Sequence, residues 1–226
     1  MAPDARPVTF LTSDSVHLRG SYWEPRDENA ISLLLIHDAE EDRNEWDPFV
    51  PLFRTRGWGV LAVDLRGHGE SVRQDMRADL LKPNPDDLTS SHQYPTDVRA
   101  SLAFLARQPK ADPAKLATIG VGLGADLAYA GSGRGWGNAS TVCVGLDEER
   151  GRALGGGGAF APRSIYLIFG AGDTASAASA VGFAAVAGYP AETYVYPDTS
   201  STGITLLRER SPEIVARSIA WIERTI

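Results

Sequence analysis

The sequence is poor in cysteine and in positive charge, and both shortages exclude classes of function. Its 226 residues carry 22 Lys and Arg against 29 Asp and Glu, a formal net charge of −7. Nucleic acids and anionic membranes bind clustered Lys and Arg, so we expect neither as a partner. The single cysteine, Cys143, cannot form an internal disulfide, and its apolar surroundings predict a buried strand thiol. No Cys or His spacing suits zinc or iron–sulfur ligation, so we expect no metal and no cofactor.

Long hydrophobic runs are also missing. No apolar run reaches the length of about 18 residues that a membrane-spanning helix needs. The first residues, Met1–Pro7, lack the apolar core of a signal peptide. We therefore expect a cytoplasmic location; a periplasmic or secreted one would require a leader ahead of this sequence.

Apolar runs alternate with helix-compatible segments along most of the chain. The stretch Val8–Tyr22 predicts a β-hairpin around the turn-prone Ser13–Ser15. Further strands are expected at 31–36, 58–63, 116–119, 141–144, 164–169 and 192–196, and helices at 46–54, 96–107, 125–130, 175–187 and 212–226, the last capped by Ser211. This order predicts one α/β domain over residues 1–226, with a mostly parallel, doubly wound sheet of about seven or eight strands, an antiparallel hairpin and helices on both faces.

Two kinds of segment interrupt the alternation. Residues 73–93 are polar and rich in proline, which predicts a short lid or loop over the carboxyl ends of the strands. The glycine-rich stretches 131–137 and 155–158 lack the Gly-Lys-Ser/Thr of a phosphate-binding loop, and we interpret them as flexible connections.

The most informative motif is Gly120-Val121-Gly122-Leu123-Gly124, which follows an apolar run and precedes a helical segment. This is the setting of the nucleophile elbow G-x-S-x-G, but Gly122 stands where the serine belongs. The central residue of such a turn has a strained backbone with positive φ, which glycine tolerates. A dinucleotide-binding turn is the alternative; that fingerprint wants G-x-G-x-x-G in the first βαβ unit, whereas this run lies mid-chain.

Three blocks resemble the α/β-hydrolase fold, specifically small bacterial hydrolases related to dienelactone hydrolases. Ile36-His37-Asp38-Ala39 resembles the oxyanion loop after the third strand, with Asp38 in place of a glycine. Asp64-Leu65-Arg66-Gly67-His68-Gly69-Glu70-Ser71 closely matches the D-x-R-G-H-G-x-S segment after the fourth strand. The third block is the elbow, followed by Gly145-Leu146-Asp147 where relatives carry a similar tripeptide.

The resemblance implies a catalytic triad in the chain order Ser, Asp, His. Mapped onto this chain, the serine falls on Gly122, the acid on Asp173 and the histidine on Thr202. Two of the three side chains that carry the chemistry are therefore absent. The backbone N–H groups of Ala39 and Leu123 correspond to the oxyanion hole, where the negative charge of Asp38 would oppose a developing oxyanion.

The histidines cannot repair the triad. His17, His37, His68 and His92 all precede the elbow, so none can occupy the late loop. We interpret His37 as an orienter of the oxyanion loop and His68 as structural. His92 lies in or beside the lid, and we keep it with His37, Asp38, Ala39 and Leu123 as a residue of the expected ligand cleft.

These observations favour a pseudoenzyme that binds a small neutral or cationic organic ligand, or a protein partner, in the former active-site cleft. A homo-oligomer is compatible with the sequence. The alternative is a hydrolase of carboxylic esters or lactones with non-serine chemistry. In that case Asp173 would orient a water, or the lid residues Ser90, Ser91 and His92 would supply a nucleophile and a base.

Overall fold

One sheet runs through the whole molecule. The computed structural model describes residues 4–226, without the side chains of residues 85 and 86. Its strands are β1 (Arg6–Leu11), β2 (Val16–Trp23), β3 (Ala30–Ile36), β4 (Gly59–Val63), β5 (Arg73–Gln74), β6 (Ala111–Val121), β7 (Ser140–Val144), β8 (Arg163–Gly170) and β9 (Gly188–Tyr196). The order is β1-β2-β4-β3-β6-β7-β8-β9, with β5 beside β2.

Strand direction divides this sheet into two parts. β1 pairs antiparallel with β2, and β2 with β4 and β5, whereas the remaining neighbours are parallel. The predicted hairpin and mostly parallel sheet are therefore confirmed. The inner parallel strands β3, β4, β7 and β8 are apolar on both faces because helices cover both sides, whereas the edge strand β9 is largely exposed.

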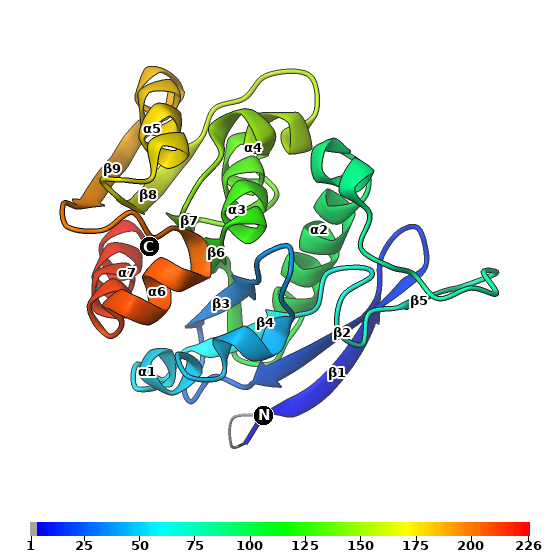
Figure 1. Cartoon of the computed structure of the whole chain (residues 1–226). Helices are drawn as coiled ribbons and strands as arrows, with labels where there is room; N and C mark the ends of the chain where they lie inside the picture. Colours follow the sequence, from blue (N-terminus) through cyan, green and yellow to red (C-terminus); the bar gives the residue numbers. More distant parts are fainter. Residues whose placement is uncertain (1–3) are drawn as a thin grey trace.

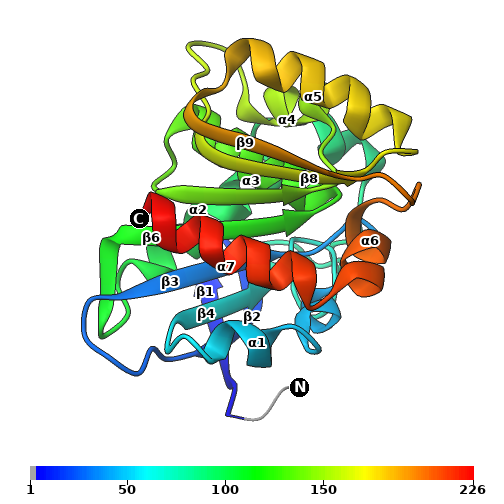
Figure 2. The same ribbon diagram turned by 90° about the vertical axis from the view of Figure 1, so that its left-hand side faces the viewer.

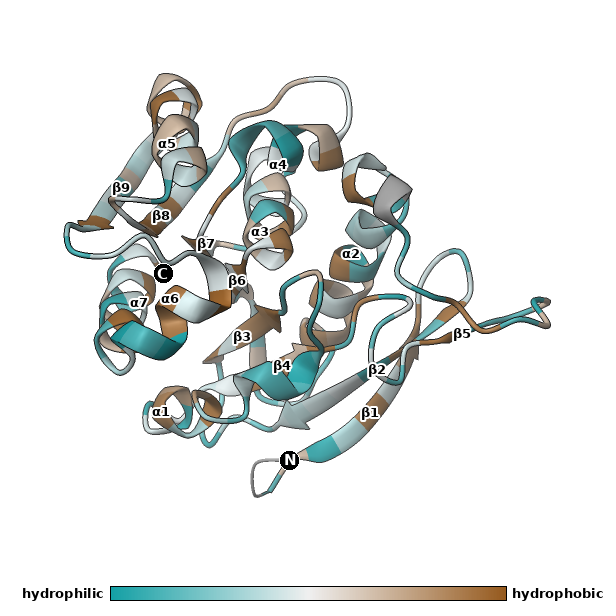
Figure 3. Cartoon of the chain, viewed as in Figure 1, coloured by the Kyte–Doolittle hydropathy of each residue, from teal (hydrophilic) through white to brown (hydrophobic). Residues whose placement is uncertain are grey.

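The helices lie in two layers, one on each face of the sheet (Figures 1 and 2). They are α1 (Val50–Arg54), α2 (Tyr94–Leu105), α3 (Leu123–Arg134), α4 (Glu148–Gly155), α5 (Thr174–Val186), α6 (Gly203–Arg210) and α7 (Glu213–Thr225), with short 3-10 helices η1 (Arg43–Trp46) and η2 (Pro85–Thr89). Alternate residues of β3 serve the two layers: Leu33 and Leu35 pack with α1, α6 and α7, and Leu34 and Ile36 with α2 and α3. Figure 3 shows β3 as a hydrophobic strand inside the molecule and a hydrophilic first turn on α4.

Several expected elements differ in the structure. The helix expected over 46–54 is divided into η1 and α1, and neither α4 nor α6 was expected. Because α6 runs to Arg210, Ser211 ends that helix, and Pro212 takes the N-cap of α7 without a side-chain cap; the prediction of Ser211 as N-cap was wrong.

The interpretation of 131–137 as a connection was wrong for its first four residues, since α3 continues to Arg134, and it holds for 135–137. A Cβ on Gly133 would lie 2.3 Å from the ring of Phe160, so glycine here makes room for an aromatic ring against the helix. Close packing explains this glycine better than loop flexibility does.

The segment 73–93 leaves the sheet at β5 and extends away from the helices before it returns (Figure 1). Its tip residue Met76 is fully exposed, and on its way back Lys82 packs its backbone against Gly67. The segment thus reaches the turn after β4, and its role as a lid stays a prediction.

Candidate functional site: a carboxylate at the elbow

The junction between β6 and α3 has the backbone geometry of a nucleophile elbow. Gly122 has φ +51° and ψ −118°, so the predicted positive φ is confirmed. A Cβ on Gly120 would lie 2.0 Å from the carbonyl oxygen of Gly124, and one on Gly124 would lie 2.2 Å from that of Ile36. The two flanking glycines therefore allow α3 to approach the sheet closely, as the motif requires.

The space where a nucleophile would sit is occupied by the side chain of Asp38. A Cβ on Gly122 would lie 2.1 Å from Asp38 Oδ1 and 2.2 Å from Cγ and Oδ2. These distances are far below van der Waals contact, so a serine at position 122 and this position of Asp38 exclude each other. The absence of a side chain at Gly122 therefore leaves the space that the Asp38 side chain occupies.

The same carboxylate takes both hydrogen-bond donors that correspond to an oxyanion hole. Asp38 Oδ1 accepts the N–H of Ala39 at 2.7 Å and the N–H of Leu123 at 3.0 Å. Leu123 is the first residue of α3, so the positive end of that helix also favours the negative charge. The site therefore holds its own anion where a reaction would develop one.

Asp173 and Thr202 lie on neighbouring loops beside the elbow. Asp173 caps α5 by accepting the N–H of Ser176 at 3.0 Å, while its Oδ2 is buried without a partner in hydrogen-bond geometry. Burial alone would raise the pKa of Asp173, but Ser176 and the nearby Thr202 hydroxyl outweigh it and lower that pKa. A Cβ on Gly203, next to Thr202, would lie 3.5 Å from the Gly122 nitrogen. The structure thus brings the expected histidine position to the elbow and the expected acid close to that position.

His37 acts on the loop backbone. Its side chain is fully buried, Nε2 accepts the N–H of Leu65 at 3.0 Å, and Nδ1 donates to the carbonyl of Asp38 at 2.6 Å. Burial lowers the pKa of His37 to about 4, so the ring is neutral at pH 7. With both nitrogens in use, His37 positions the 37–39 loop and has no ring nitrogen left for a ligand.

His92 is not among the residues brought to the elbow. It is exposed just before α2, where its main chain bonds to the Ser90 and Thr96 side chains. Ser91 packs against Gly156 at the end of α4. Nothing in these contacts joins the lid residues to Asp38.

Two ionisable residues that the sequence analysis missed interact with the Asp38 loop, one by a hydrogen bond and one through charge. Glu45 on η1 is buried and accepts the Asp38 N–H at 3.1 Å; burial and the Asp38 charge raise the pKa of Glu45 to about 9. Arg150 on α4 pairs with the buried Asp126 at 2.5 Å. Burial works against the Arg150 charge, but Asp126, Asp147 and Asp38 outweigh it and raise its pKa. Neither residue belongs to a motif, so only the fold reveals them.

The 64–71 turn, which follows β4, lies beside this site and is held by many hydrogen bonds. Asp64, fully buried, accepts the N–H groups of Arg43 and Glu70, both at 2.8 Å. Arg66 pairs with the buried Asp97 at 2.7 Å and with Asp14. His68 Nε2 lies 2.7 Å from the Ala39 carbonyl, which joins this turn to the 37–39 loop. The side chains of the 64–71 motif therefore hold neighbouring segments of the chain in place.

An acidic pocket of about 510 Å³ adjoins these two loops. Its lining includes Glu45 and His68, which also bond to the backbone of the 37–39 loop. Glu40, Glu41 and Asp42 make its wall acidic, and Arg208 opposes them. Among residues 4–226, no group of three or more His, Cys, Asp or Glu side chains could hold a metal ion. Nor is any helix within the described range long and apolar enough to cross a membrane.

Similarity to known proteins is visible in the structure alone. No protein-family model matches the sequence, and no curated protein matches it either. An esterase from Pyrococcus furiosus is 18% identical, with a TM-score of 0.73 over 98% of this chain and 91% of the esterase. The α/β hydrolase GrgF from Penicillium is 12% identical, with a TM-score of 0.75 over 98% of each chain.

A dienelactone hydrolase from Anabaena variabilis is 16% identical, with a TM-score of 0.71 over 99% of this chain and 97% of that one. Identities this low establish the architecture only. Together with the mostly parallel sheet, its antiparallel hairpin and the glycine-flanked turn after β6, these likenesses show that the chain has the α/β-hydrolase fold.

Proposed function

We propose that this chain is a hydrolase-fold pseudoenzyme that binds a small ligand or a protein partner and does not hydrolyse esters by the serine route. The observation that carries the proposal is the Asp38 carboxylate, which fills the space beside Gly122 and takes the N–H groups of Ala39 and Leu123. A substrate carbonyl would have to displace an anion from donors that already stabilise it.

The missing side chains support the same proposal. An acyl-enzyme needs an activated hydroxyl, and its formation and breakdown need an imidazole. At the matching positions this chain has Gly122 and Thr202, so Asp173 has no imidazole to orient. Removing triad members from serine hydrolases leaves roughly 10³–10⁴-fold catalysis over water, from binding and the oxyanion hole. Here the hole is filled as well.

The acidic pocket beside the 37–39 loop is our candidate ligand site. It lies where ligands bind in open α/β sheets, beyond the carboxyl ends of the parallel strands. Its acidic lining favours a small neutral or cationic organic molecule over an anion. Glu45, protonated at pH 7 because its pKa is raised to about 9, adds a polar group without adding charge.

Esterase assays with a gain-of-function control test the proposal. The wild-type chain should not turn over p-nitrophenyl acetate or dienelactone faster than a heat-denatured sample, and a fluorophosphonate probe should not label it. The variant Asp38→Gly/Gly122→Ser/Thr202→His should gain weak, measurable esterase activity and probe labelling. The variant Asp38→Gly/Gly122→Ser, without the histidine, should stay near background because Ser and His act as one unit. Saturable hydrolysis by repurified wild-type protein would overturn the proposal.

A second candidate, an ester or lactone hydrolase with a carboxylate nucleophile, follows from the same side chain. Asp38 Oδ2 lies where a nucleophilic oxygen would be, while Oδ1 is held by backbone donors. Attack on an ester carbonyl would form an anhydride and expel the alkoxide; water would then hydrolyse the anhydride. Hydrolysis that is present in the wild type and lost in Asp38→Asn would favour this candidate.

A further inference from the structure

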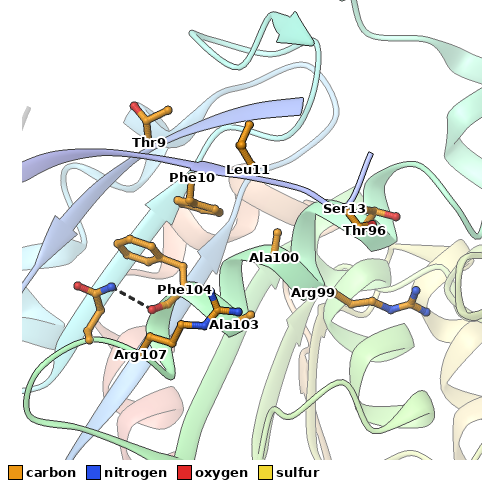
Figure 4. A pocket seen from close by; sticks show the side chains of 11 residues that line it. Thr9, Phe10, Leu11, Ser13, Thr96, Arg99, Ala100, Ala103, Phe104 and Arg107 are labelled. Carbon is orange, nitrogen blue, oxygen red and sulfur yellow. Dashed lines mark hydrogen bonds between the residues drawn. The ribbon is translucent and has the colours of Figure 1, made fainter. Parts of the chain in front are cut away.

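A groove of about 730 Å³ lies between the edge strand β1 and helix α2, apart from the elbow and from the acidic pocket. Thr9, Phe10 and Leu11 contribute from β1, and Ala103, Phe104 and Arg107 are among the residues from α2 and the turn after it. The volume is in the range of small-molecule sites, about 300–1,000 Å³. Figure 4 shows Phe10 of β1 and Phe104 of α2 pointing toward each other across this groove.

The floor of this groove is apolar and aromatic. The rings of Phe10 and Phe104 are stacked with centroids 4.7 Å apart, and Ala100 and Ala103 line the helix side (Figure 4). Leu11, at the end of β1, is 54% exposed. Small residues on the helix and a stacked aromatic pair on the floor leave room for an apolar chain.

The rim carries positive charge in a chain that is negative overall. Arg99 and Arg107 line the groove and are exposed, and its lining contains no Asp or Glu. The Arg99 guanidinium lies 4.7 Å from the centroid of the Trp136 ring, and its side chain extends away from the Phe10–Phe104 pair (Figure 4). Among the ion pairs of the side chains that the structure describes, none involves Arg99 or Arg107. Two arginines without a carboxylate partner in that set therefore line one groove.

We propose that this groove binds a free carboxylate with an unbranched apolar tail, of the fatty-acid class. The tail lies along Phe10 and Phe104, and the carboxylate is bound by Arg99 or Arg107, whose planar groups match a carboxylate in a bidentate pair. Charge decides the class: the acidic pocket beside Glu45 would repel this ligand, and the groove lining has no acidic residue to do so.

Two surfactants with the same tail and opposite headgroup charge test whether the groove selects a carboxylate. Each is titrated into the full chain by calorimetry, below its critical micelle concentration. Decanoate should bind with one-to-one saturation, and decyltrimethylammonium should bind roughly tenfold or more weakly, a difference of about 1.4 kcal/mol. The variant Arg99→Glu/Arg107→Glu should bind decanoate more weakly than the wild type by a similar factor. The double variant Arg73→Glu/Arg77→Glu, at two exposed positions outside the groove, makes the same change in net charge; as the control, it should leave decanoate affinity unchanged. Equal affinity for both surfactants, or equal loss in the control, would overturn the proposal.

A space-filling variant tests the location. Ala103→Trp should abolish decanoate binding while circular dichroism and the melting temperature show a folded protein. Undiminished binding by this variant would place the ligand elsewhere and overturn the proposal. So would a stable dimer in sedimentation velocity that Leu11→Asp dissociates, because β1 would then be covered by a second copy of the chain.

Discussion

Two loops that follow neighbouring strands differ in what their side chains do. After β4, the 64–71 turn uses Asp64 and His68 to hold neighbouring backbone, and its Arg66 donates to the Asp97 carboxylate. After β3, the 37–39 loop directs the Asp38 carboxylate into the place of a nucleophile and onto its oxyanion donors. The first loop stabilises the backbone around it, and the second places a carboxylate in the space beside Gly122. Two loops that follow neighbouring strands of one sheet therefore differ in what their side chains contact.

The structure also couples two sequence features that look independent of each other. In the sequence, Asp38 and Gly122 are separate replacements 84 residues apart. In the structure they are coupled, because the carboxylate of one uses the space left by the other. Gly203, beside Thr202, also faces this carboxylate, since a Cβ there would lie 2.9 Å from Asp38 Oδ2.

The largest expected effect is a loss of stability when the ion pair of the 64–71 turn is broken. Asp97→Ala leaves the buried Arg66 without its main partner, and losing one member of a buried ion pair costs about 3–5 kcal/mol. Urea denaturation should show a fall of this size in the free energy of unfolding. Asp14→Ala removes the more exposed partner of the same arginine and should cost less. Equal, small losses in both variants would show that the buried Arg66–Asp97 pair does not stabilise the 64–71 turn.

The next effect tests the coupling at the elbow. Gly122→Ser places a side chain at positive φ and against the Asp38 carboxylate, which should cost about 2–3 kcal/mol. Adding Asp38→Gly removes the clash, so the double variant should be destabilised less than the sum of the two single variants by about 1 kcal/mol or more. Chemical denaturation of all four proteins measures this difference. Additive losses would show that positions 38 and 122 do not share one space.

The sequence predicted most strands and the turn at Gly122, but it did not predict which side chains occupy the site. Apolar runs buried on both faces predict β3, β4, β7 and β8 well, and the glycine pattern predicts the turn at Gly122. Helices α4 and α6 were missed because α4 begins with Glu148, Glu149 and Arg150 and both helices have only eight residues.

The position of the Asp38 side chain could not be predicted from spacing. The sequence shows a carboxylate where a glycine is expected, and it indicates an opposing charge near the oxyanion donors. Only the fold shows that Oδ1 of that carboxylate accepts the Leu123 N–H from a residue 85 positions away. Glu45 was missed for a similar reason: its burial follows from how η1 packs, and no local motif marks it.

A smaller effect concerns the proton on Glu45. Its pKa is raised from 4.5 to about 9, because burial and the charge of Asp38 disfavour its ionised form. The folded chain keeps this proton up to about pH 9 while the unfolded chain releases it near pH 4.5, so the stabilisation is complete below pH 4.5 and is lost as the pH rises toward 9.

Glu45→Gln does not titrate, so its unfolding free energy should exceed that of the wild type by about 1 kcal/mol or more at pH 8 and lose this advantage at pH 5. Urea denaturation at the two pH values measures the change. Glu40→Gln, at an exposed position on the preceding loop, makes the same replacement of a carboxyl by an amide and is the control. The same pH profile in both variants would contradict the account.

The central claim is that the Asp38 carboxylate itself occupies the oxyanion donors, and chemical rescue tests it most directly. Asp38→Gly removes the atoms that acetate contains, leaving the N–H groups of Ala39 and Leu123 without an acceptor. Acetate should stabilise Asp38→Gly saturably, by about 1 kcal/mol at a concentration several times its dissociation constant. It should also shift the amide resonances of Ala39 and Leu123, while wild-type protein and chloride controls stay unchanged. Amide shifts of equal size in the wild type, or none in the variant, would contradict the claim.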